Sequence, residues 1–196
     1  MTTVLTDDGV GTSGRVNGWW LVGLLRIAFG WVWLWAFLDK MFGLGYATCA
    51  STNDAGEKTI ELMCDAAFIN GGSPTYGVLT FGTQGSKTGW LFDWMAPAAP
   101  DAPNWADWLF MLGLLLIGLP FILGVGVRLS GIGGVIMYLF MYLAIAVPPA
   151  NNPIVDDHIL GALTMGLLVF LNAGVYLGIG RWWQGLDIVK RFPILE

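Results

Sequence analysis

The sequence has little charge and almost none of the side chains that hold metals. Of its 196 residues, 12% are charged, one is histidine and two are cysteine. A metal centre or a haem held by paired histidines therefore lacks ligands, and we expect no metal site. Nine Lys and Arg stand against 14 Asp and Glu without a basic stripe, which excludes nucleic-acid binding. A Gly-rich nucleotide loop, a nucleophile elbow and a Cys-x-x-Cys motif are also lacking.

Apolar side chains are in excess instead. Hydrophobic residues make up 56% of the chain and the mean hydropathy is +0.66, which is too apolar for a soluble domain of this size. About 20 apolar residues cross a bilayer core of roughly 30 Å. We therefore predict an all-α integral membrane protein, a four-helix bundle over residues 19–180 with no room for a large soluble catalytic domain. The expected helices cover about 19–41, 105–127, 129–148 and 158–180.

The distribution of Lys and Arg predicts the orientation, because these residues favour the cytoplasmic ends of spans. With both termini inside, five basic residues are cytoplasmic and three are outside. We predict a multi-pass protein of the bacterial cytoplasmic (plasma) membrane, with cytoplasmic tails at 1–18 and 181–196 and no cleaved signal peptide. The inner residues are Arg15, Arg128, Arg181, Lys190 and Arg191, and the outer ones are Lys40, Lys58 and Lys87.

The connection at 42–104 lies outside the cytoplasm in this topology. It is too long to lack structure of its own, so we expect it to be partly folded. Residues 57–68 place Ile60, Met63 and Cys64 at helical spacing, which predicts a short amphipathic helix. The aromatic residues between 75 and 94 are typical of anchoring at a bilayer interface.

The two cysteines, Cys49 and Cys64, both lie in this outer loop. Oxidising conditions outside the cytoplasm allow a disulfide to persist, and closing this loop would stabilise the fold by roughly 3 kcal/mol. The alternative is a redox-active pair that exchanges with a sulfur substrate or passes electrons to a quinone. Such a pair needs a thiol of low pKa, and the acidic neighbours of these cysteines have the opposite effect. The structural disulfide is therefore the favoured interpretation.

Arg26 is a single charge inside the first span, about seven residues or roughly 10 Å from its cytoplasmic end. A charge at that depth costs at least a few kcal/mol unless it is paired. It either extends toward the head groups or forms an internal ion pair or ligand anchor. Asp187 and Asn172 are the candidate partners for the internal arrangement.

A second set of polar residues stands at the outer ends of the predicted helices. It contains the only histidine, which is the side chain that titrates nearest neutral pH. These residues either cap helices, which we favour, or protonate and hydrogen-bond a quinone head group. The candidates for cofactor binding are Arg26, Asp39, Lys40, Asp107, Asp156, Asp157 and His158.

Five stretches resemble a known family: residues 25–44, 67–74 (AFINGGSP), 107–128, 151–160 (NNPIVDDHIL) and 178–187. They resemble the DoxX/DoxD family of small four-helix membrane proteins of bacteria and archaea, especially its actinobacterial members. One branch of that family is the large subunit of thiosulfate:quinone oxidoreductase, which works with a small partner subunit. The resemblance implies a membrane redox setting. The N-terminal tail and residues 49–64 lie outside it.

Two functions follow as hypotheses. The first is a non-catalytic accessory subunit of a membrane respiratory or redox complex, in contact with lipid and with other subunits. Close helix packing is expected at two small-residue pairs, Gly174 with Gly178 and Ser130 with Gly134.

The alternative is a quinone-dependent oxidoreductase subunit that oxidises thiosulfate or thiols at the outer face. A quinone, menaquinone or similar, would lie between the first and fourth helices near Lys40, Asp157 and His158. The catalytic candidates are Cys49, Cys64 and His158, with the two cysteines as the sulfur site.

Overall fold

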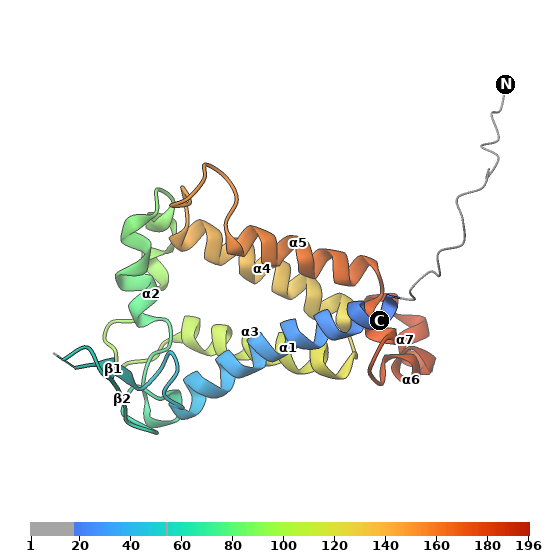
Figure 1. Cartoon of the computed structure of the whole chain (residues 1–196), viewed down its shortest axis with the longest axis horizontal. Coiled ribbons are helices and arrows are strands. Elements are labelled where there is room, and N and C mark those ends of the chain that lie inside the picture. Colours follow the sequence, from blue (N-terminus) through green and yellow to red (C-terminus); the bar gives the residue numbers. More distant parts are fainter. Residues whose placement is uncertain (1–17, 54) are drawn as a thin grey trace.

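The computed structural model describes residues 18–53 and 55–196, so the predicted tail at 1–18 lies outside the described residues except for Gly18. The described chain is mostly helical (Figure 1). Three helices are long and apolar enough to cross a membrane: α1 (Trp19–Phe42), α3 (Trp105–Leu123) and α4 (Val127–Ile145). Helices therefore occupy the first three predicted positions, with ends that differ from the predicted ones by up to four residues.

The fourth predicted helix, at 158–180, is wrong in extent. The helix found there, α5 (Asp157–Phe170), has 14 residues, which is roughly 21 Å and short of a bilayer core. Asn172 then takes a left-handed conformation with φ of 49°, and a short turn at Ala173–Val175 leads to a bent segment in which Leu177 also has a φ of 49°. The Asn172 side chain accepts a hydrogen bond of 2.7 Å from Gln184 Nε2, which fixes this reversal.

The predicted C-terminal tail is folded. It forms α6 (Gly180–Gly185), α7 (Asp187–Arg191) and a final turn, η5 (Pro193–Leu195). The beginning of α1 and the C-terminus lie at the same end of the molecule (Figure 1).

The long helices form two pairs, α1 along α3 and α4 along α5, which join where α3 packs against α4. The pairs diverge toward the end that carries β1 and β2 (Figure 1). Close approach of α1 and α3 depends on glycine, because a Cβ on Gly30 would lie 2.9 Å from the carbonyl oxygen of Gly118. The buried core between the pairs contains Trp33, Met111, Leu114, Ile117, Phe121, Val127, Met165 and Leu168.

The small-residue pairs predicted to pack closely do so within the chain. A Cβ on Gly174 would lie 2.8 Å from the Gly124 oxygen, and one on Gly178 would lie 2.6 Å from the Leu123 oxygen. Both glycines follow α5 and lie against the end of α3. In the second pair, a Cβ on Gly134 would overlap the Met165 side chain of α5, whereas the Ser130 hydroxyl donates to the carbonyl of Gly126, the N-cap of α4.

The outer connection is partly folded, as predicted, but residues 57–68 do not form a helix. Instead β1 (Ala50–Thr52) pairs antiparallel with β2 (Lys58–Ile60). The Asn53 side chain accepts hydrogen bonds from two backbone N–H groups of the turn, which closes the hairpin. The remaining elements are η1 (Phe68–Asn70), α2 (Tyr76–Thr80), η2 (Gly82–Gly85) and η3 (Gly89–Met95).

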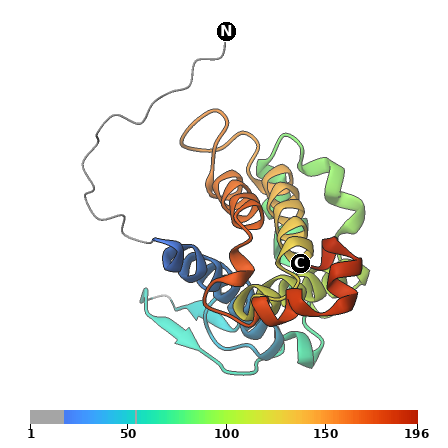
Figure 2. The ribbon, with the colours of Figure 1, turned by 90° about the vertical axis from the view of Figure 1, so that its right-hand side faces the viewer.

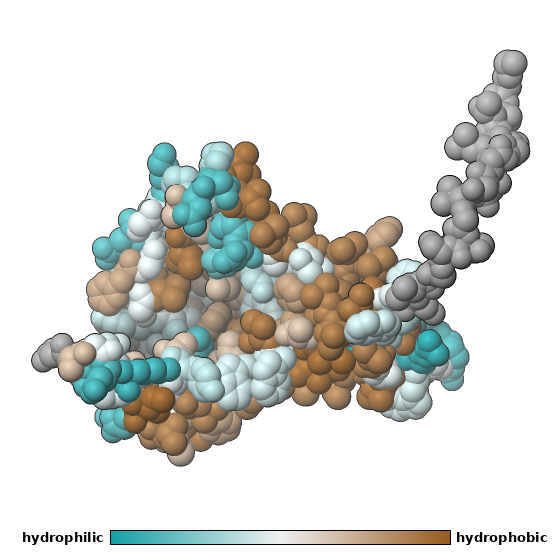
Figure 3. Space-filling view, in the orientation of Figure 1, coloured by the Kyte–Doolittle hydropathy of each residue, from teal (hydrophilic) through white to brown (hydrophobic). Residues whose placement is uncertain are grey.

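Apolar residues cover the visible faces of the long helices, and hydrophilic residues gather around the loops (Figure 3). Bulky side chains are exposed along all four long helices, among them Val32, Leu116, Ile136 and Leu163. A surface of this kind suits lipid or the helices of another membrane protein.

Candidate functional site

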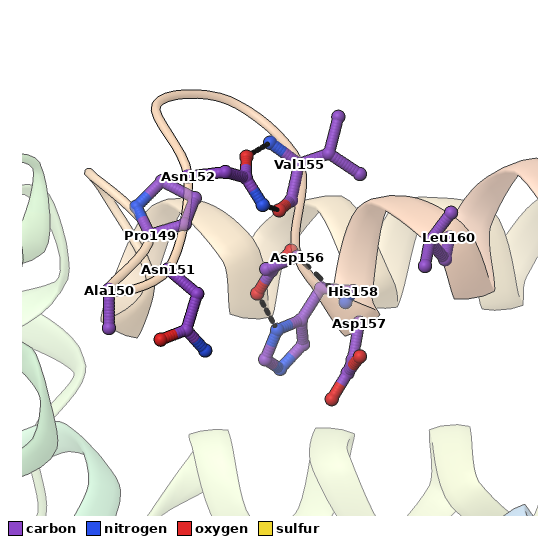
Figure 4. Close-up of a pocket in the computed structure, with 9 residues that line it drawn as sticks. All are labelled: Pro149, Ala150, Asn151, Asn152, Val155, Asp156, Asp157, His158 and Leu160. Carbon is purple, nitrogen blue, oxygen red and sulfur yellow. Dashed lines mark hydrogen bonds and ion pairs between the residues drawn. The ribbon is translucent and has the colours of Figure 1, made fainter.

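A pocket of about 290 Å³ lies where the chain enters α5 (Figure 4). The loop before it contains Pro148, Pro149 and Pro153, which prevent α4 from continuing into α5. Asn151, Asp157 and His158 point to the same side of this loop (Figure 4). The lining residues are Pro149, Ala150, Asn151, Asn152, Val155, Asp156, Asp157, His158 and Leu160.

Asp156 organises this pocket as the N-cap of α5. Its Oδ1 accepts hydrogen bonds of 3.1 Å from the backbone N–H groups of His158 and Ile159. Its Oδ2 lies 2.5 Å from Nδ1 of His158. Because the carboxylate occupies Nδ1, the imidazole is held in one orientation and Nε2 is left for another partner.

Burial of Asp156 opposes its ionisation, but hydrogen bonds to the carboxylate outweigh that effect. The bonds from the His158 side chain and from the two backbone N–H groups favour the charged form, and the pKa of Asp156 is lowered. Asp156 is therefore a carboxylate at neutral pH.

Two aromatic side chains extend the site inward, and the sequence did not single them out. The Tyr138 ring lies 6.4 Å from the His158 ring, centroid to centroid, and 4.9 Å from the Trp33 ring in an edge-to-face contact. Gly161 leaves room for the tyrosine, since a Cβ there would lie 2.6 Å from Tyr138 Cζ. The indole Nε1 of Trp33 is buried and has no hydrogen-bond partner among the described residues.

The predicted outer rim does not form one site. Asp39 and Asp107 are both almost completely buried, and neither they nor Lys40 line the pocket of His158. Asp39 accepts hydrogen bonds of 2.9 to 3.0 Å from three consecutive backbone N–H groups, those of Tyr46, Ala47 and Thr48. It fixes the turn that follows α1 and does not cap a helix.

Asp107 ties the outer connection to α3. Its Oδ1 accepts from Ser73 Oγ and from the backbone and hydroxyl of Thr75, each at 2.8 Å. Its Oδ2 accepts from the backbone of Asn104 at 2.9 Å, which completes a capping box. Its oxygens are therefore committed to the fold.

Arg26 is fully buried, so it does not extend to the head groups. The predicted partners Asp187 and Asn172 are wrong, because the guanidinium donates to four backbone carbonyls. Nη1 donates to the carbonyls of Phe121 and Ile122, and Nη2 donates at 2.9 Å to those of Tyr176 and Leu177. The positive charge faces the negative end of the α3 dipole.

Arg26 also completes the hydrogen bonding of the last turn of α3, whose carbonyls have no partner within the helix. The Pro120 carbonyl accepts from two following backbone N–H groups. The carbonyls of Phe121 and Ile122 accept from Arg26, and the Leu123 carbonyl accepts from the Ile179 N–H at 3.0 Å. The guanidinium thus joins α1, the end of α3 and the chain after α5.

Cys49 and Cys64 form a disulfide, which confirms the predicted pairing. It closes the base of the β1–β2 hairpin, where the Glu61 N–H donates to the Cys49 carbonyl at 3.1 Å. Within residues 18–53 and 55–196, no cluster of three or more His, Cys, Asp or Glu is arranged to hold a metal ion.

No family model, curated protein or solved structure matches the chain. The resemblance to the DoxX/DoxD family therefore stays a prediction that rests on the five stretches named above.

Proposed function

We propose that this chain is a membrane-embedded, non-catalytic accessory subunit of a larger redox or respiratory assembly, with the DoxX-like architecture expected from its sequence. What supports the proposal is how the fold uses its polar side chains. Arg26, Asp39 and Asp107 serve backbone groups, and the cysteines are joined to each other. Most of the residues that suggested chemistry therefore hold the scaffold together.

A groove beside α5 is the surface we assign to a partner's transmembrane helix. Two of the residues that line it, Ala162 and Gly166, are small, and small residues let helix backbones approach closely. Leu163 and Phe170 on its rim are 66% and 86% exposed. A neighbouring helix here would also complete the apolar thickness that α5, at roughly 21 Å, does not reach.

The test is purification of the tagged chain from its native membrane in mild detergent, with and without Gly166→Leu. We expect stoichiometric recovery of haem- or quinone-binding membrane subunits with the wild-type chain and their loss when the leucine fills the groove. Gly133→Leu is the matched control, because a Cβ at either glycine meets nothing closer than 3.9 Å. Recovery that is equal for all three proteins, or no such subunit with the wild type, would refute the proposal.

A second function has its own observation in its favour, the His158–Asp156 pair in the pocket at the start of α5. Reduction of a quinone consumes two electrons and two protons. An imidazole held by a carboxylate is suited to hydrogen-bond a quinone oxygen and to transfer a proton to it. In this alternative the electrons come from thiosulfate or a thiol oxidised at the outer face.

Quinone reduction by the purified chain, with and without thiosulfate, distinguishes this alternative. His158→Gln should abolish turnover, whereas Asp93→Asn, which removes an exposed carboxylate outside the pocket lining, should leave turnover unchanged. Cys49→Ser tests the sulfur site separately: turnover that persists in this variant removes the cysteines from the mechanism. If the chain neither binds nor reduces quinone, the enzymatic alternative is refuted and the accessory function is the one that remains.

A further inference from the structure

The C-terminal segment crosses the end of the bundle instead of continuing it. Figure 2, which looks toward this end, shows α6 and α7 from the side while α4 and α5 are seen nearly end-on. The segment is held at both ends: the Ile179 N–H donates to the last carbonyl of α3, and the Arg128 N–H donates at 2.7 Å to the carbonyl of Glu196. It therefore lies across the helix axes, at the end of two apolar spans.

Its inner side is a small packed core. Val189 is fully buried, and Trp183 Nε1 donates to the Leu195 carbonyl at 2.5 Å. Arg128 closes the arrangement, with one nitrogen donating to the Pro193 carbonyl and the other to the Glu196 carboxylate, both at 2.7 Å. These contacts give the segment a defined conformation, in which the side chains outside this core are left exposed.

The outward side combines bulky apolar residues with basic ones. Trp182, Ile188 and Phe192 are 50 to 63% exposed; Ile188 lies in α7 and Phe192 is the C-cap residue that follows this helix. Arg191 lies 5.7 Å from the centre of the Phe192 ring, and Arg181 precedes the exposed tryptophan. Aromatic and basic side chains together are typical of a helix that lies in a membrane interface.

The charged side chains of this surface that form no ion pair with a described residue are positive. The two acids of residues 181–196 are already engaged, Asp187 with Lys190 at 3.7 Å and Glu196 with Arg128 at 2.7 Å. Arg181 and Arg191 form no ion pair with any described residue. A neutral interface would satisfy the apolar side chains alone, whereas an anionic one also satisfies the two guanidinium groups.

From this placement we infer that α6 and α7 form an interfacial platform that binds the head groups of anionic phospholipids. The apolar side chains enter the head-group region, and Arg181 and Arg191 pair with lipid phosphates. Each basic residue near an anionic leaflet strengthens attachment by about fivefold, so the two together give roughly 25-fold. This inference does not depend on the proposed function.

Hydrogen exchange of the full chain in nanodiscs tests it. The amides of residues 180–192 should exchange up to about 25-fold more slowly in phosphatidylcholine with phosphatidylglycerol than in phosphatidylcholine alone. The difference should disappear in the double variant Arg181→Gln, Arg191→Gln and shrink at about 1 M salt, where the Debye length is about 3 Å. Both side chains are exposed, so these changes leave the inner packing intact.

The matched control is the double variant Lys58→Gln, Lys87→Gln, which removes two exposed cations far along the chain from the platform. It should keep the wild-type response to phosphatidylglycerol. Equal exchange in the two membranes would overturn the inference. So would a response that survives loss of both arginines, or one that both double variants lose equally.

Discussion

Replacement of Arg26 should separate the chain after α5 from the rest of the bundle. In Arg26→Met the four carbonyls lose their donor, and those of Phe121 and Ile122 belong to a helix end with no other donor for them. Leaving a buried acceptor unpaired costs about 1–3 kcal/mol, so two such carbonyls give about 2–6 kcal/mol. Arg26→Lys should lose a comparable amount, because one ammonium cannot reach both carbonyl pairs.

The measurement is denaturant unfolding in detergent micelles, combined with hydrogen exchange of residues 171–180. We expect this segment to lose protection in Arg26→Met before the rest of the chain unfolds. Arg181→Met is the matched control, since that arginine is exposed and should change stability by less than about 0.5 kcal/mol. Unchanged unfolding and unchanged exchange in Arg26→Met would refute the role assigned to the guanidinium.

Three further predictions concern the start of α5 and the disulfide. The lowered pKa of Asp156 means that its contribution to stability is present above the usual aspartate range and is lost as pH falls through its folded-state pKa, so Asp156→Asn should lower stability at pH 7 and weaken the acid dependence of thermal unfolding. Cys49→Ser should lower the free energy of unfolding by roughly 3 kcal/mol, and reductant should do the same to the wild type but not to the variant. Gly161→Val should displace the Tyr138 ring and destabilise the chain by about 1–3 kcal/mol, whereas Gly161→Val together with Tyr138→Ala should recover part of the loss.

Features that depend on neighbours in sequence were predictable. Length and apolar composition predicted the places of three helices long and apolar enough to cross a membrane, since a helix in a bilayer satisfies its own backbone. Asp107 and Asp156 take part in capping α3 and α5, as the capping interpretation of the polar helix ends predicted, whereas the N-cap Asn104 was not anticipated. The loop with Cys49 and Cys64 allowed a disulfide to be proposed because only two cysteines exist.

Other features had a local signal that was outweighed. Residues 57–68 carry apolar spacing compatible with a helix, yet Thr59 and Ile60 are β-branched, and Asn53 and Gly56 form a turn before them. The hairpin forms instead of a helix because β1 pairs with β2 across that turn and the disulfide joins the two sides of the hairpin. Tyr138 could also have been singled out, because its side chain carries a hydroxyl in the middle of the apolar helix α4.

The sequence by itself determined that this chain is apolar, mostly helical and capped by short polar residues, because those properties follow from composition and from contacts within about four residues. Only the tertiary structure decided where Arg26 donates, where α5 stops and that residues 180–195 fold across the end of the bundle. The partners of Arg26 lie 95 to 151 residues away in the chain. A backbone carbonyl has no identity in the sequence, so no pattern of residues could have named the acceptors of that buried charge.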